Sequence, residues 1–144
     1  MILFCLQERR PLMSKKVIEK KSKLELEYSL RSSPHILYQY ISSPSGLQSW
    51  FADHVDVQGG ASFKFSWDDG TEYNAELTKN IPGKLVKFDL IGSPGDFLEF
   101  KIAQEEITGD IELIITEMVY PDEAEMSASI WDAAVEQLCS VIGA

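Results

Sequence analysis

The chain has 144 residues, of which 44% are hydrophobic and 25% are charged, a balance that is typical of one compact globular domain. Its formal net charge is −10, from 13 basic and 23 acidic residues, so its surface repels nucleic-acid phosphates and anionic membrane headgroups. The two cysteines, Cys5 and Cys139, lie at opposite ends of the chain and do not form a disulfide framework, which predicts a reducing, cytoplasmic location.

The first twelve residues, MILFCLQERRPL, differ in character from the rest. Their apolar run is too short for the hydrophobic region of a signal peptide, and no basic residues precede it. The following sequence, Met13-Ser14-Lys15-Lys16, is typical of a natural start. We therefore expect residues 1–12 to be an extension outside the fold and residues 13–144 to form a single domain.

Residues 23–30 alternate polar and apolar side chains, which is typical of a strand with one buried face. The alternation predicts an inner face made of Leu24, Leu26, Tyr28 and Leu30.

The tripeptide Ser-Ser-Pro follows this strand and occurs twice, at residues 32–34 and 42–44. Serine is a favoured N-cap, a residue before proline is pushed toward the extended geometry that an N-cap needs, and proline suits the first helical position. Each copy therefore predicts a helix start. Both helices are too short to be stable alone in water, so they must pack on other elements. We expect their contact face to be formed by Ile36, Leu37, Tyr40, Ile41, Leu47, Trp50 and Phe51.

Residues 61–120 have the pattern of an antiparallel meander. Alternation predicts strands over residues 61–67, 73–77, 85–90, 97–104 and 111–120. Turn sequences separate them, namely Asp68-Asp69-Gly70, Ile81-Pro82-Gly83-Lys84, Ser93-Pro94-Gly95-Asp96 and Thr108-Gly109-Asp110.

The last part of the chain predicts one long helix from about residue 123 to residue 142. Pro121 ends the preceding strand, the acidic residues after it suit a helix start, and Gly143 closes the pattern. A broad apolar face recurs at helical spacing and consists of Ile130, Trp131, Ala134, Val135, Leu138, Val141 and Ile142.

This order of elements resembles the START/Bet v 1-like helix-grip (SRPBCC) superfamily over residues 17–143. The resemblance rests on Ser43-Pro44-x-x-Leu47-x-x-Trp50-Phe51, on the hairpin Phe63-x-Phe65-x-Trp67-Asp68-Asp69-Gly70, and on a terminal helix with Trp131 and Leu138. The chain is similar to the branch named for the activator of the heat-shock-protein-90 ATPase, and most similar to small bacterial START-like single-domain proteins.

The resemblance implies an α+β fold. A curved antiparallel sheet of about six or seven strands would wrap around a long C-terminal helix, with two short helices between the first and second strands. It also implies a ligand cavity between the sheet and that helix. It does not determine a reaction, because members of the superfamily bind lipids, sterols, polyketides and plant hormones, while others are cyclases, oxygenase domains or chaperone assistants.

We find no catalytic constellation and expect no metal and no cofactor. Asp53-His54-x-Asp56 has ligand-type side chains, but neighbouring positions on an extended segment point in opposite directions, and we favour a solvated acidic loop. The inward positions of the predicted strands are poor in groups that move protons. Tyr28 and Tyr73 are the exceptions, and each is also interpretable as a core aromatic residue with a satisfied hydroxyl.

The large aromatic residues have two interpretations, the lining of a ligand pocket or the filling of a core. The pair Trp50-Phe51 should lie where the short helices, the sheet and the long helix meet, either at the mouth of a cavity or as the plug of the core. The candidate ligand-binding residues are Trp50, Phe51, Phe63, Phe65, Trp67, Tyr73, Phe88, Phe100, Trp131 and Leu138.

The hypothesis that we favour is a non-catalytic binding module for a hydrophobic small molecule, lipid-like or polycyclic, in a chain that is a monomer or a homodimer. An alternative is a protein-interaction or chaperone-cofactor domain that acts through an acidic surface, with Glu112, Glu117, Asp122, Glu123 and Glu125. A second alternative is a cyclase- or hydrolase-like enzyme. A buried carboxylate, or His54 directed into a cavity, would favour the enzyme.

Overall fold

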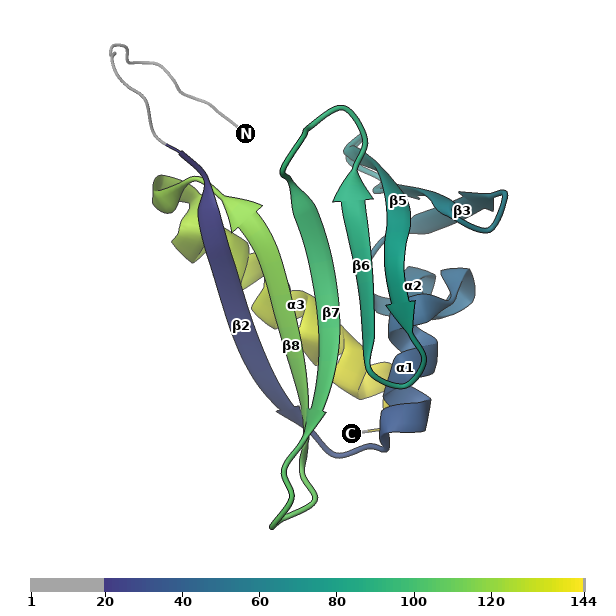
Figure 1. The fold of residues 1–144 in the computed structure, drawn as a ribbon, viewed down its shortest axis with the longest axis vertical. Coiled ribbons are helices and arrows are strands. Elements are labelled where there is room, and N and C mark those ends of the chain that lie inside the picture. The colour runs from purple at the N-terminus through teal and green to yellow at the C-terminus, as the bar shows by residue number, and fades with distance from the viewer. Residues whose placement is uncertain (1–19, 144) are drawn as a thin grey trace.

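The computed structural model describes residues 20–143 (Figure 1). The expected extension at residues 1–12 lies outside the described residues. Strands and helices follow one another in the order β2 (Ser22–Leu30), α1 (Pro34–Ser42), α2 (Pro44–Trp50), β3 (His54–Gln58), β4 (Ser62–Ser66), β5 (Glu72–Ile81), β6 (Leu85–Leu90), β7 (Phe97–Gln104), β8 (Ile111–Val119), the 3₁₀ turn η2 (Pro121–Glu123) and α3 (Ala124–Ile142).

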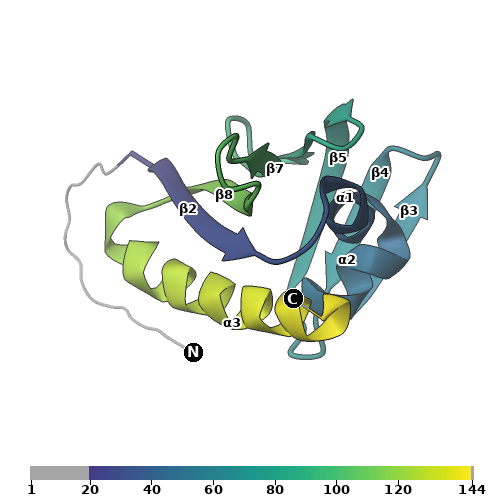
Figure 2. The ribbon, with the colours of Figure 1, turned by 90° about the horizontal axis from the view of Figure 1, so that it is seen from below.

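The strands form one antiparallel sheet in the order β2-β8-β7-β6-β5-β4-β3. From β3 to β8 each strand pairs with the next along the chain, whereas β2 returns to pair with β8. The sheet curves around α3, and α1 and α2 lie beside the C-terminal end of that helix (Figures 1 and 2). This architecture confirms the predicted α+β helix-grip fold.

The core lies between the sheet and the helices, as the alternation in the strands predicts. Phe65, Phe88 and Phe100 are fully buried on the inner face of β4, β6 and β7. On β2, Leu30 is buried and the other three predicted inward residues are half-buried, while the intervening residues are exposed. No helix among residues 20–143 is long and apolar enough to cross a membrane.

Both Ser-Ser-Pro copies start helices, as predicted. Ser33 has extended backbone geometry, and its Oγ accepts the N–H of Ile36 at 3.1 Å. Ser43 has the same geometry, and its Oγ accepts the N–H of Gly46 at 3.0 Å. Each cap satisfies one of the free N–H groups of a helix start. Since Ser43 also closes α1, one residue both ends the first helix and begins the second.

The structure corrects three expectations for single residues. Ile36 keeps 43% of its surface exposed, because the inward stripe of α1 is centred on the i, i+4 pair Leu37 and Ile41. Ile130 and Val141 of α3 are 62% and 37% exposed, since the buried stripe of this helix is narrower than its apolar pattern.

The acidic loop expected around residues 53–56 is in fact the start of strand β3. Its sequence HVDVQ alternates, with Val55 buried and His54, Asp56 and Gln58 exposed. The strand pairs with β4 along its whole length, from His54 opposite Ser66 to Gln58 opposite Ser62. Pairing with β4 supplies the backbone hydrogen bonds that make so short a strand stable.

Gly46 provides a test of how closely α2 packs on α1. A Cβ atom on this residue would lie 2.7 Å from Cα of Tyr40 and would also collide with the carbonyl oxygen of Gln39. We expect Gly46→Ala to lower the free energy of unfolding by roughly 1–3 kcal/mol, measured by urea denaturation, because backbone atoms must shift. Ser45→Ala, at the exposed preceding position, should change it by less than about 0.5 kcal/mol. Equal effects of the two changes would contradict this packing.

Candidate functional site

A cleft lies between the N-terminal half of α3 and the inner face of the sheet. It consists of two adjoining hollows of about 260 Å³ and about 580 Å³. Both are lined by Tyr73, Glu117, Ser127, Ile130 and Trp131, so they are parts of one space, which we call the α3 cleft. The smaller part extends toward Phe51 and Trp67, and the larger part extends toward β2 and the β6–β7 turn.

The cleft exists because α3 packs on the core along only part of its length. Its buried residues are Trp131, Val135 and Leu138, and no residue between Ala124 and Ile130 is buried. The helix follows directly from the end of β8 through η2 and runs along the sheet (Figure 2). The two hollows lie under its first half.

Aromatic rings form the inner wall of the α3 cleft. The ring of Phe51 stacks on that of Trp131, with centroids 5.4 Å apart and planes 3° apart. Trp67 meets Phe51 edge to face at 5.4 Å, and Tyr73 meets Trp67 in the same way at 5.4 Å. Nε1 of Trp67 donates a hydrogen bond to the backbone oxygen of Phe51 at 3.0 Å. The one polar atom of the indole is therefore satisfied, and the rest of the ring is apolar.

Glu117 places a carboxylate beside these aromatic rings. It lies in the inner row of β8 with Leu113, Ile115 and Val119, and its partners across the sheet are apolar, Leu24 on β2 and Leu98 on β7.

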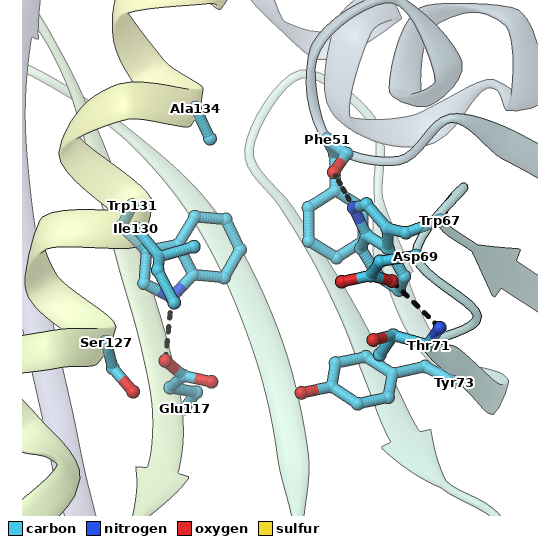
Figure 3. A pocket seen from close by; sticks show the side chains of 10 residues that line it. All are labelled: Phe51, Trp67, Asp69, Thr71, Tyr73, Glu117, Ser127, Ile130, Trp131 and Ala134. Atoms are coloured by element: carbon cyan, nitrogen blue, oxygen red, sulfur yellow. Dashed lines mark hydrogen bonds between the residues drawn. The ribbon is translucent and has the colours of Figure 1, made fainter. Parts of the chain in front are cut away.

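One carboxylate oxygen of Glu117 is held in place by the long helix. Nε1 of Trp131 donates to Oε2 at 2.7 Å (Figure 3). Burial raises the pKa of Glu117 above its usual value, and this hydrogen bond only partly opposes the rise.

Two hydroxyl groups share the space with Glu117. The ring of Tyr73 extends from β5 across the cleft, and its hydroxyl points toward the side on which Glu117 lies (Figure 3). Burial raises the pKa of Tyr73, and the charge of Glu117 raises it further. Ser127 directs its hydroxyl into the same space from the first half of α3 (Figure 3).

Charged groups border both ends of the cleft. Beside the smaller part, Oδ1 of Asp69 accepts the N–H of Thr71 at 2.9 Å, and this bond lowers the pKa of the exposed Asp69 carboxyl group. In the larger part, Nζ of Lys21 lies 2.6 Å from Oδ2 of Asp96, and the hydrogen bond raises the pKa of Lys21.

The structure divides the ten residues predicted to bind a ligand into two groups. Phe51, Trp67, Tyr73 and Trp131 line the α3 cleft. The other six are buried in the core and do not line it, namely Trp50, Phe63, Phe65, Phe88, Phe100 and Leu138. Some of the aromatic residues therefore line a cleft, and the others fill the core. Ligand contact by the lining residues stays a prediction.

The pair Trp50-Phe51 is divided in the same way. Trp50 is a plug, because it is buried against Phe100 and its Nε1 donates to the backbone oxygen of Tyr40 at 2.8 Å. Phe51, at the next position, forms part of the cleft wall.

The expectation that Glu117 belongs to an acidic surface cluster is wrong, because Glu117 lies on the inner face of β8. The alternation of β8 identifies its position. Every second residue from Ile111 to Val119 faces inward, and Glu117 belongs to this row with Ile111, Leu113, Ile115 and Val119. Ser127 was also missed. It lies four residues before Trp131 and seven before Ala134, on the helix face that carries both.

Two other polar candidates lie outside the cleft. The hydroxyl of Tyr28 donates to Oδ1 of Asp132 at 2.6 Å, and burial raises its pKa. Nε2 of His54 lies 3.1 Å from Oδ1 of Asp68, with both side chains largely exposed. Within the described residues, no group of three or more His, Cys, Asp or Glu side chains is arranged to hold a metal ion.

Comparison with solved structures shows the same fold in proteins from several bacteria. A Bacteroides fragilis protein is 32% identical, with 85% of this chain and 92% of that chain covered and a TM-score of 0.60. The Aha1 dimer from Colwellia psychrerythraea is 23% identical, with 83% of this chain and 92% of that chain covered and a TM-score of 0.64. DynU16, a protein in the dynemicin biosynthetic locus, is 15% identical, with 84% of this chain and 47% of that chain covered and a TM-score of 0.69. Below 25% identity such a likeness shows the fold alone.

No curated protein matches the sequence. The model of the START-like superfamily domain matches residues 18–144, which is most of the chain. Together with the Bacteroides fragilis structure, this match shows that the chain belongs to the START-like superfamily.

Proposed function

We propose that this protein binds a small apolar molecule in the α3 cleft and acts as a binding module. The observation that carries the proposal is the unfilled space under the first half of α3, where no helix residue is buried and four aromatic rings form a wall. Ligand pockets in proteins are concave, mostly apolar and supplied with a few polar groups that orient the ligand. The smaller part of the α3 cleft has this composition, with Glu117, Tyr73 and Ser127 as its central polar groups, while the lining of the larger part also carries charged residues.

The rim of the cleft supports the same proposal. Ile91, Met126 and Ile130 are 58%, 63% and 62% exposed, and all three line the larger part of the cleft. Exposed apolar side chains that gather around one concavity are typical of a binding site. A ligand in the cleft would cover them and gain about 25 cal/mol per Å² of apolar surface removed from water.

Domains with a START-like fold generally bind hydrophobic ligands, which agrees with the proposal. A cytoplasmic location and a monomeric or homodimeric state stay predictions. So does a protein partner for the acidic surface, which without Glu117 consists of Glu112, Asp122, Glu123 and Glu125.

A steric block tests the binding site. We expect a screen of fatty acids, sterols, polycyclic aromatics and hydrophobic amines to yield ligands that raise the Tm, since a bound ligand at about 100 times its Kd adds about 2.7 kcal/mol of stability. Ser127→Phe, which fills the cleft, should abolish this rise. Ser129→Phe, at an exposed position of the same helix, should retain it. The proposal is wrong if no compound raises the Tm or if both variants respond like the wild type.

A second candidate function is catalysis of the cyclase or hydrolase kind, and the carboxylate of Glu117 favours it. A general acid or base works best when its pKa lies near the working pH, and burial moves the pKa of Glu117 in that direction. The hydroxyl of Tyr73 shares the cleft and would be the second proton-handling group.

The raised pKa of Glu117 has a measurable effect on stability. Because the folded state holds this proton more tightly than the unfolded state, the Glu117 contribution to stability is complete below the ordinary pKa and is lost as the pH rises through the raised value. The free energy of unfolding of Glu117→Gln minus that of the wild type should therefore increase from about pH 4 to about pH 7 in urea titrations. A difference that stays constant over this range would contradict a raised pKa.

Mass spectrometry of a bound compound separates catalysis from binding. For an enzyme, we expect the mass of the compound to change during incubation with the wild type and to stay constant with Glu117→Gln. A compound that binds and is recovered unchanged from the wild type would favour the binding module.

A further inference from the structure

We propose that the α3 cleft selects ligands that carry a protonated amino group, and that Glu117 is the residue that binds this group. The inference rests on the proposed binding function and names the chemical class of the ligand. It would make the cleft unsuited to fatty acids and other apolar carboxylates.

The charges around the cleft are the first reason. Its described lining includes five carboxylates, Asp69, Glu72, Asp96, Glu117 and Glu123. Glu72 is paired at 3.6 Å with Lys64, which lies outside the lining. The basic residue in this lining is Lys21, and its ammonium group is already paired with Asp96 at 2.6 Å. A ligand carboxylate would therefore enter a negative field without a free cation to receive it, whereas an ammonium group would be attracted.

The geometry of Glu117 is the second reason. Oε2 is held by the indole N–H of Trp131 at 2.7 Å, so the carboxylate is already oriented before a ligand arrives. Among residues 20–143, no side chain donates to Oε1, so this oxygen can accept a hydrogen bond from a ligand. A hydrogen bond from an ammonium group to a carboxylate is short and strong because both partners are charged.

The missing counter-charge is the third reason. Within residues 20–143, Glu117 forms no ion pair, since Nζ of Lys21 lies 2.6 Å from Oδ2 of Asp96 and not on Glu117, and burial raises the pKa of Glu117. A carboxylate that is partly buried without a cation is costly, and a cationic ligand would remove this cost. The indole of Trp67 and the phenol of Tyr73 add to the preference, since aromatic ring faces attract ammonium groups.

Three compounds with the same ring system but different charge show how far ligand charge, as opposed to ligand shape, determines affinity. We would measure the Kd of 1-naphthylmethylamine, 1-naphthalenemethanol and 1-naphthoate by calorimetry, with the fluorescence of Trp67 and Trp131 as a second signal. The amine should bind roughly tenfold to hundredfold more tightly than the alcohol, and the carboxylate should bind most weakly.

Two variants of β8 then assign the effect to Glu117. Glu117→Gln retains an oxygen for the indole N–H of Trp131 but removes the charge, and it should reduce amine affinity by about the same factor while alcohol affinity changes little. Glu112→Gln changes the net charge equally on the opposite face of the strand and should leave the ranking of the three compounds intact. If Glu117→Gln does not fold, the wild-type ranking alone decides.

The outcomes distinguish the two proposals. If the alcohol binds and the amine binds no more tightly, or if both variants weaken amine binding equally, the amine inference is overturned and the binding function stands. If none of the three compounds binds and the apolar screen also fails, both proposals are overturned.

Discussion

The indole ring of Trp131 is the contact on which both the packing of the long helix and the candidate site depend. It stacks on Phe51 at the end of α2, and it meets Phe100 of β7 edge to face with ring centroids 5.8 Å apart. Its N–H donates to Glu117 of β8. One side chain thus connects α3 to the short helices and to the centre of the sheet. The closed core begins on one side of this ring, and the α3 cleft lies on the other.

The division at Trp131 also explains why the cleft is not filled. Beyond it, Val135 and Leu138 continue the buried stripe of α3 and pack into the core. Before it, the corresponding face carries Ser127, and the small side chain leaves the opposite wall of β5 and β8 uncovered. A partly buried carboxylate in such a place reduces stability, and functional sites commonly retain a cost of this kind.

Much of the fold could be predicted from the sequence because its signals are local. The two Ser-Ser-Pro caps depend on the geometry of four consecutive residues, and alternation along β2, β7 and β8 depends only on the pleat of a strand. The loop expected before Gln58 became strand β3 because its stability comes from β4, which is a partner in space. The exposure of Ile36 and Ile130 likewise depends on which part of each helix touches the core.

The sequence by itself determined the element order, the helix starts and the aromatic character of the interior, because these follow from propensity and periodicity. Only the tertiary structure decided which rings fill the core and which face a space, since this depends on where α3 leaves the sheet. It also decided the role of Glu117. The alternation of the strand places that residue on the inner face of β8. Its environment comes from Leu24, Leu98 and Trp131, which lie on three other elements. A carboxylate gains a raised pKa and a fixed orientation only from such neighbours.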